Sequence, residues 1–543
     1  MRVPPTPSSV ANSVARRTFL STLFTVSTLP ALPLRASAAD AIVKASGVGL
    51  QQFAVQASAL DPRAHRGLIL GNGMRVLLTS YPTAAKGAAS LNVQVGYMTD
   101  PADYAGLAHF CEHMLFLGTK KFPNEGDFEK VVSTGGGSNN AYTASEETNY
   151  FFDVQGNSLK PALERFAGFF VDPLFTEAAT AREVNAIDSE HSKNLQSDFW
   201  RFGQLIKLRC DPTHPYAKFG TGNRKTLRDG DAGARDALLR FHSRYYQADQ
   251  MSLALVGPQP LDELQKLAVQ NFADVPVTVP QLPSSSAAYD PLPLPFRPAE
   301  SKPEAYLMVP VNDVRNLNVQ WCVPVTDLEG WIRSKPDDVW QLLIRNRAQG
   351  GLLPLLKRKG LAAGLSADVD EMTRSWVLLS VNIDLTPLGL QKWRAVSSML
   401  FAYLRMLVAS GPPTTLINEV ISLDQTGFTY AEPSEPESFA TSASPNLPFY
   451  TPDKWLTGPA LAEAGAEEEV ARLLRACAEP SNAMITLAAR SNEPKADLTE
   501  PIYGTRYVPA RPHLSTAPHP SHFLPTVHVY PSTGMASSPL SAR

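Results

Sequence analysis

Two histidines and a glutamate occupy one five-residue stretch, His109-Phe110-Cys111-Glu112-His113. On an α-helix, residues i and i+4 lie on one face, so His109 and His113 can direct two imidazoles at one ion. Two neutral imidazoles and one carboxylate from elsewhere make a three-ligand zinc site with a fourth position open to water. Glu112 flanks that position, where a carboxylate can take a proton from the water. The alternative is a pair of structural histidines, which is the commoner fate of this spacing.

A second helix would have to supply the carboxylate ligand. Glu183 and Glu190 are seven residues apart in one helical segment, and this spacing places both on one face. An exposed acidic helix is the alternative, above all for Glu183. His191 follows Glu190 directly and is turned away by about 100° on the helix, so we expect it to be structural or to support a ligand.

The elements that would position these residues indicate an α+β fold. Asn72-Gly73 is a hairpin signal before an apolar strand. Apolar residues then alternate with polar ones over 89–95, which predicts a strand with one buried face. Hydrophobic periodicity predicts further elements: helices over 159–170, 176–208, 236–246, 261–272 and 387–409, and strands over 251–256 and 376–384.

The 543 residues are too many for one hydrophobic core. Residues 277–303 are rich in proline, which lacks a backbone N–H donor and disfavours both helix and sheet. We therefore expect an interdomain linker there. It separates a first lobe at 50–276, which holds the candidate site, from a second lobe at 304–507. The two lobes are alike in length and in mixing helices with strands, which suggests a duplication.

Both ends of the chain differ in composition from the lobes. Residues 1–39 contain arginine but no Asp or Glu, and an apolar stretch precedes Ala36-Ser37-Ala38, as in a cleavable signal segment. Arg16-Arg17 resembles a twin-arginine signal, which predicts export to a bacterial periplasm or a thylakoid lumen; a plastid or other organellar transit peptide is the alternative. Residues 510–543 are rich in Pro, Ser, Thr and His, and we expect a disordered tail. No run of 18 apolar residues follows the leader, so no stable membrane span is expected.

Charge and cysteine content exclude several classes of function. Lys and Arg total 49 against 52 Asp and Glu, which leaves a net charge of −3 and no basic surplus for nucleic-acid binding. The four cysteines form no Cys-x-x-Cys pair, so a metal would use histidine and carboxylates. Cys111 is expected to be a small apolar filler, although thiol sensitivity beside the histidines is the testable alternative.

Four stretches of the first lobe resemble the insulysin/pitrilysin family of zinc metallopeptidases, the inverzincins. They are GLAHFCEHMLFLGTKKFP, Gly137–Thr143, REVNAIDSEHSKN and HPYAKFGTGN at 214–223. The chain is most similar to the insulin-degrading-enzyme branch, which also has Cys between the first His and the Glu. The resemblance spans roughly residues 60–508, because KGLAAGLSADVD, NIDLTPLGL and YGTRY in the second lobe match too.

The resemblance implies two similar α/β-sandwich lobes of the pitrilysin/processing-peptidase type in tandem, the second non-catalytic. It implies one Zn²⁺ per chain bound by His109, His113 and Glu190. Glu112 would be the general base of a zinc endopeptidase, and Glu183 would support the site. Peptide substrates would bind as an added strand along Asn140, Ala141 and Tyr142. Tyr142 would line a side-chain pocket, or pack across the strands.

The chain also departs from the family it resembles. Those enzymes have four homologous domains, and their second half supplies an Arg and a Tyr near the reacting carbonyl. We therefore expect that a separate C-terminal-half chain completes the enzyme, or that two copies associate as a homodimer, or that the chain is a truncated form. The alternative function is a peptide-binding or regulatory half-subunit with little activity of its own. Residues 345–351 also lack the His-Glu-Gly with which the family anchors a substrate's amino terminus.

Overall fold

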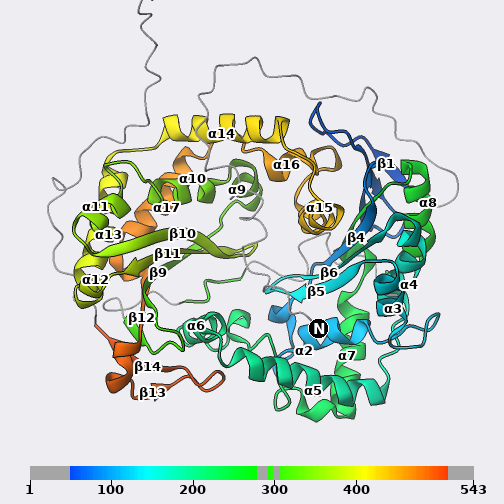
Figure 1. The fold of residues 1–543 in the computed structure, drawn as a ribbon, viewed down its shortest axis with the longest axis horizontal. Coiled ribbons are helices and arrows are strands. Elements are labelled where there is room, and N and C mark those ends of the chain that lie inside the picture. The colour runs from blue at the N-terminus through cyan, green and yellow to red at the C-terminus, as the bar shows by residue number, and fades with distance from the viewer. Residues whose placement is uncertain (1–48, 278–291, 297–304, 512–543) are drawn as a thin grey trace, which may run out of the picture.

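The computed structural model describes residues 49–277, 292–296 and 305–511. The expected signal segment, most of the expected linker and nearly all of the expected tail lie outside these residues. Figure 1 shows the described chain as two sheets, each with its own helices, lying on either side of the molecule.

The first sheet has seven strands in the order β1-β2-β3-β7-β4-β6-β5. Only β3 and β7 pair in parallel; the other neighbours are antiparallel. The strands are β1 Gln51–Phe53, β2 Ala64–Ile69, β3 Arg75–Ser80, β4 Lys86–Val93, β5 Ser138–Thr143, β6 Thr148–Gln155 and β7 Met251–Gly257. The helices that follow these strands are α2 Leu107–Leu115, α3 Asp127–Thr134, α4 Leu159–Val171, α5 Glu177–Asn194, α6 Asp198–Lys207, α7 Ala232–Tyr245 and α8 Leu261–Phe272.

The second sheet repeats this plan, with seven strands in the order β10-β11-β9-β12-β8-β14-β13 and one parallel pair, β8 with β12. Its strands are β8 Ala305–Met308, β9 Arg315–Pro324, β10 Ala362–Met372, β11 Trp376–Leu385, β12 Ala483–Ala489, β13 Leu498–Thr499 and β14 Arg506–Ala510. The helices in this part of the chain are α9 Leu328–Ser334, α10 Pro336–Ile344, α11 Leu352–Arg358, α12 Pro387–Gln391, α13 Trp393–Ala409, α14 Thr414–Thr429, α15 Pro436–Ala443, α16 Thr457–Ala460 and α17 Glu467–Ala478. The expected α+β class with two similar lobes is confirmed.

The prediction that β4 buries one face is wrong. Every residue of the strand after Lys86 is buried, including Ser90 and Asn92. The helices of the first lobe cover one face of the sheet, and α15, from far along the chain, packs on the other. Ser90 Oγ lies 2.8 Å from Ser444 Oγ just after α15. The polar residues of β4 therefore face a helix instead of water.

Two helices predicted as continuous are broken. The segment 176–208 divides into α5 and α6, which are separated by residues 195–197, and 387–409 divides at Lys392. The first break has a tertiary cause, because the Asp198 carboxylate at the start of α6 accepts hydrogen bonds from the Val311 and Asn312 amides of the second lobe. Within the described residues no single helix is long and apolar enough to cross a membrane; α13 and α14 pass that test only together, and they are bent by 94°.

Turns at the inner edges of the two sheets meet. Ser145 Oγ, in the turn between β5 and β6, donates to Glu371 Oε1 of β10 at 2.6 Å. Arg374, in the turn between β10 and β11, donates to Gln94 Oε1 beyond β4 at 2.5 Å. These contacts fix β5, the edge strand of the first sheet, with its edge toward the second lobe (Figure 1).

Candidate metal centre

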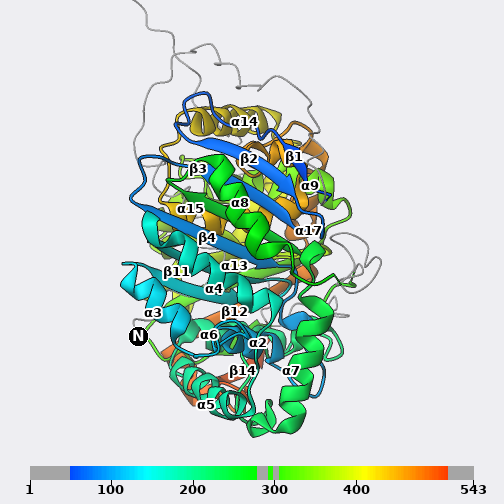
Figure 2. The same cartoon turned by 90° about the vertical axis from the view of Figure 1, so that its right-hand side faces the viewer.

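Helix α2 carries the five-residue motif and is anchored firmly at its start. Gly106 precedes it with φ of 92°, and a Cβ there would lie 2.2 Å from the Cα of Gly222, so no other residue fits. The buried Asp100 carboxylate accepts hydrogen bonds from the amides of Gly106 at 2.6 Å and Ala108 at 2.8 Å. These bonds satisfy two donors of the first turn and fix the helix against its neighbours. Figure 2 shows α2 with α5 and α7 at one end of the first lobe.

Three side chains from α2 and α5 converge on one point. The Nε2 atoms of His109 and His113 are 3.2 Å apart, and Glu190 Oε2 lies 3.7 Å and 3.6 Å from them. Zinc bonds of about 2.0–2.2 Å at tetrahedral angles separate neighbouring donor atoms by about 3.3 Å. The donor set therefore fits one zinc ion with little movement. Within the described part of the chain, this is the one group of three or more His, Cys, Asp or Glu side chains with that geometry.

The second nitrogen of each imidazole has its own partner. His109 Nδ1 lies 2.8 Å from the backbone oxygen of Thr221, and His113 Nδ1 lies 2.9 Å from Glu183 Oε1. An N–H on Nδ1 donates to these oxygens and leaves the Nε2 lone pair free for a cation. Such partners orient metal-binding imidazoles and raise their basicity. Glu183 and Glu190, which were predicted to share one helix face, both reach the site. Glu183 contacts Nδ1 of His113, and Glu190 lies near Nε2 of the same ring.

Carboxylates govern protonation at the centre. Burial lowers the pKa of His113, but hydrogen bonds with Glu183 and Glu190 outweigh it and raise that pKa to about 10. Burial raises the pKa of Glu190, but its contacts with His113 and His109 outweigh it and hold that pKa at about 2. Without metal, the two carboxylates therefore favour a second proton on His113, at Nε2. A cation must displace that proton, so metal affinity falls as the pH falls.

Glu112 lies beside the ligand cluster, and a residue of the sheet fixes its orientation. Its side chain is on α2 next to His113, and the residue is 7% exposed. Thr143, the last residue of β5, donates from Oγ1 to Glu112 Oε2 at 2.5 Å. The strand that precedes the turn toward the second lobe therefore fixes the carboxylate's orientation.

Strand β5 holds the expected peptide-binding residues. Asn140, Ala141 and Tyr142 pair with β6 on one side, and among the described strands β5 has no neighbour on its other side. The Tyr142 hydroxyl donates to Glu147 Oε1 at 3.1 Å across the hairpin. That contact favours the cross-strand packing role for Tyr142 over a pocket-lining role.

Cys111 and His191 lie outside the ligand set. Cys111 is fully buried among apolar side chains, and burial raises the pKa of its thiol. Both facts favour the filler role, and thiol sensitivity stays a prediction. The His191 ring packs edge-on against Phe219 and Tyr503, with ring centres 5.2 and 5.0 Å away. It therefore supports α5 structurally.

The sequence analysis did not identify three residues that orient the site. Thr221 contacts His109, Thr143 contacts Glu112, and Asp100 anchors the start of α2. Thr221 and Thr143 are distant in sequence from α2, whereas Asp100 lies just before it, and none of the three belongs to a pattern that predicts its role. Thr221 does lie in HPYAKFGTGN, one of the stretches that carried the resemblance, and Thr143 ends another. Those stretches were the signal that could have pointed to both residues.

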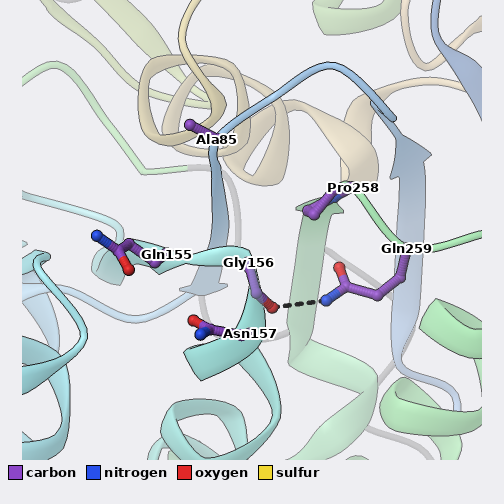
Figure 3. A pocket seen from close by; sticks show the side chains of 6 residues that line it. All are labelled: Ala85, Gln155, Gly156, Asn157, Pro258 and Gln259. Atoms are coloured by element: carbon purple, nitrogen blue, oxygen red, sulfur yellow. Dashed lines mark hydrogen bonds between the residues drawn. The ribbon is translucent and has the colours of Figure 1, made fainter.

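A surface hollow of about 520 Å³ lies away from this centre. Its lining contains no ionisable side chain and comprises Ala85, Gln155, Gly156, Asn157, Pro258 and Gln259 (Figure 3). Gln259 Nε2 donates to the Gly156 oxygen at 2.7 Å across it. The hollow sits at the Gln155 end of β6, whereas Thr143 pairs with Thr148 at the opposite end. It contributes no chemistry to the metal centre.

Comparison with known proteins identifies the family. The insulinase (peptidase family M16) model matches residues 75–213, the peptidase M16 inactive domain matches 234–423, and the middle or third domain of peptidase M16 matches 428–513. The chain belongs to this family of zinc metallopeptidases, so the expected resemblance is confirmed.

Individual relatives agree with the family. The insulin-degrading enzyme of Bos taurus is 39% identical over 454 residues, which is 82% of this chain and 43% of that protein. A Schizosaccharomyces pombe protein named as a putative zinc protease is 36% identical over 459 residues, 82% of this chain and 46% of the relative. The crystal structure of pitrilysin superimposes with a TM-score of 0.79 at 28% identity, over 87% of this chain and 49% of that one. The chain therefore spans about half the length of the relatives it matches, and the tandem pitrilysin-type fold is confirmed.

The support from Glu183 can be measured directly. We expect Glu183→Gln to weaken zinc binding by roughly 10- to 100-fold, because the neutral amide no longer raises the basicity of His113. Competition with a chromophoric chelator gives the dissociation constant. Glu177→Gln is the matched control, since Glu177 is exposed at the start of the same helix. Equal zinc affinities of Glu183→Gln and the wild type would show that Glu183 does not support zinc binding.

Proposed function

We propose that the chain is a zinc endopeptidase that hydrolyses peptides at the centre formed by α2 and α5. The convergence of His109, His113 and Glu190 at zinc-ligand spacing beside Glu112 carries this proposal. Zinc bound there supplies a Lewis acid that polarises a carbonyl and lowers the pKa of water to about 7.

The chain's own residues supply the proton transfer. Glu112, oriented by Thr143, accepts the proton of the attacking water and passes it to the leaving amine. Thr221 and Glu183 hold the two imidazoles in the required orientation. One zinc per chain suffices for these roles.

An extended peptide fits the open edge of β5. Backbone hydrogen bonds along Asn140, Ala141 and Tyr142 would bind it as an added strand, next to Thr143 and therefore next to Glu112. Main-chain pairing tolerates many sequences, which supports a broad peptide specificity.

Backbone pairing predicts a specific substrate defect. We expect a peptide N-methylated at alternate residues to bind about fivefold more weakly for each hydrogen bond lost, since one such bond contributes about 1 kcal/mol. Inhibition of the cleavage of an unmodified peptide gives its affinity. A peptide of the same sequence methylated on the other set of alternate residues is the control. Equal affinity of both methylated peptides and the parent would argue against strand addition.

The test of the proposed function is cleavage of a quenched, extended peptide by the full chain. We expect turnover that a chelator abolishes and one equivalent of zinc restores. The second candidate is a peptide-binding half-subunit that needs a partner chain or a second copy. It would bind one zinc and the peptide, yet turn the peptide over only after the partner is added. A chain that neither binds zinc nor cleaves the peptide would contradict both.

Two further features stay proposals. We place the lobe boundaries at residues 50–276 and 304–507, and we propose that residues 1–39 direct export or organellar import. Sequencing the amino terminus of the processed protein tests the second, with a start directly after Ala38 as the expected result.

A further inference from the structure

The turn between β13 and β14, residues 500–505, brings the second lobe to the metal centre. It carries Tyr503, which is 2% exposed. The Tyr503 hydroxyl lies 3.3 Å from Oγ1 of Thr221, and the backbone oxygen of Thr221 is the partner of His109 Nδ1 at 2.8 Å. One residue, Thr221, therefore links the tyrosine to a metal ligand.

The tyrosine ring reaches a second ligand by another route. It packs edge-on against His191, whose ring centre is 5.0 Å away, and His191 is the chain neighbour of Glu190. The rings of Phe219 and Trp200 pack on Tyr503 as well, with centres 6.0 and 6.4 Å away. Tyr503 thus touches one neighbour of each of two ligands that come from different helices.

The turn itself is fixed from both lobes. The fully buried Glu500 carboxylate accepts hydrogen bonds from the amides of Ile502 and Tyr503, each at 2.7 Å. From α6, Arg201 donates to the backbone oxygens of Tyr503 at 2.8 Å and Gly504 at 3.2 Å. A residue held this tightly can transmit its own position to the groups that it contacts.

We propose that Tyr503 is a positioning residue for the metal centre, supplied by the otherwise non-catalytic second lobe. Tyr503 fixes the Thr221 carbonyl, which orients His109. Through its contact with His191, Tyr503 also stabilises the part of α5 that carries Glu190. This inference rests on the proposed metal site and adds a reason why the second lobe is needed for it. Outer partners of ligands typically change metal affinity by 10- to 100-fold, and Tyr503 is one contact further out, so we expect about 3- to 10-fold.

The test measures zinc dissociation constants of the full chain by chelator competition, together with the absorption spectrum of the Co²⁺-loaded form. Tyr503→Phe removes only the hydroxyl and should weaken zinc about threefold; Tyr503→Leu also removes the ring packing and should weaken it about tenfold, with an altered Co²⁺ spectrum. Tyr507→Phe and Tyr507→Leu are the controls, because the Tyr507 ring packs against Tyr306 on β8. Thermal unfolding of the metal-free variants separates a general loss of stability from a local effect.

The outcomes are distinct. Zinc affinities of both Tyr503 variants within twofold of the wild type, or an equal loss in the Tyr507 variants, would overturn the inference. If Tyr503→Leu does not fold, Tyr503→Phe decides alone by the same criterion. A wild-type chain without zinc would instead contradict the proposed metal site, and that result does not depend on any Tyr503 variant.

Discussion

The Glu112→Gln variant should bind one zinc with wild-type affinity and lose peptide hydrolysis by on the order of 1,000-fold. General acid–base groups typically contribute 100- to 10,000-fold, and a side-chain amide cannot accept the proton of the attacking water. The substitution preserves size, and Thr143 Oγ1 can still donate to the amide oxygen. The donor atoms of His109, His113 and Glu190 are untouched, so the metal content should not change.

Initial rates on a quenched peptide, with zinc per chain determined on the same samples, measure both expectations. Glu468→Gln is the matched control, because it makes the same change on the exposed side of α17. A Glu112→Gln rate within tenfold of the wild type would show that another group moves the proton. Loss of zinc from that variant would show that Glu112 belongs among the ligands.

The second large effect is expected for Glu190→Ala. This carboxylate is the one member of the proposed ligand set that comes from α5, and its removal would leave two imidazoles to hold the ion. We expect zinc affinity to fall by more than 100-fold, beyond the range typical of outer partners such as Glu183. At micromolar zinc the variant should bind too little metal, and peptide hydrolysis should therefore be lost.

Equilibrium dialysis followed by metal analysis determines the affinity. Glu177→Ala at the start of α5 is the control, because it removes an exposed carboxylate from the same helix. The ranking of the three variants by zinc affinity matters most. Glu190→Ala should bind zinc most weakly, Glu183→Gln should be intermediate, and Glu177→Ala should equal the wild type. A Glu190→Ala chain that binds zinc within tenfold of the wild type would assign the third ligand elsewhere.

The sequence predicts those parts of the centre that depend on local periodicity. His109 and His113 share a helix face because of their spacing of four, and Glu183 and Glu190 share one because of their spacing of seven; the structure places all four in one cluster. The helix over 261–272 is also as predicted, since its apolar positions repeat cleanly and Pro260 precedes it. Local signals were sufficient for these elements.

Other features depend on tertiary contacts and could not be read locally. Strand β4 alternates like a half-exposed strand, yet α15 arrives from more than 300 residues away to bury its polar face. The break after α5 is stabilised by the second lobe through Asp198. The Thr221 carbonyl acts through a backbone atom, which leaves no residue-type signature.

The central claim, that two imidazoles and one carboxylate of this chain hold a single zinc ion, is tested most directly by zinc K-edge X-ray absorption. The sample is the full chain loaded with one equivalent of zinc, compared with Glu190→Ala. We predict a first shell of nitrogen and oxygen only, at about 2.0–2.2 Å, with outer-shell scattering from two imidazoles. A sulfur shell at about 2.3 Å, or a spectrum unchanged by Glu190→Ala, would place the metal at other residues and contradict the account.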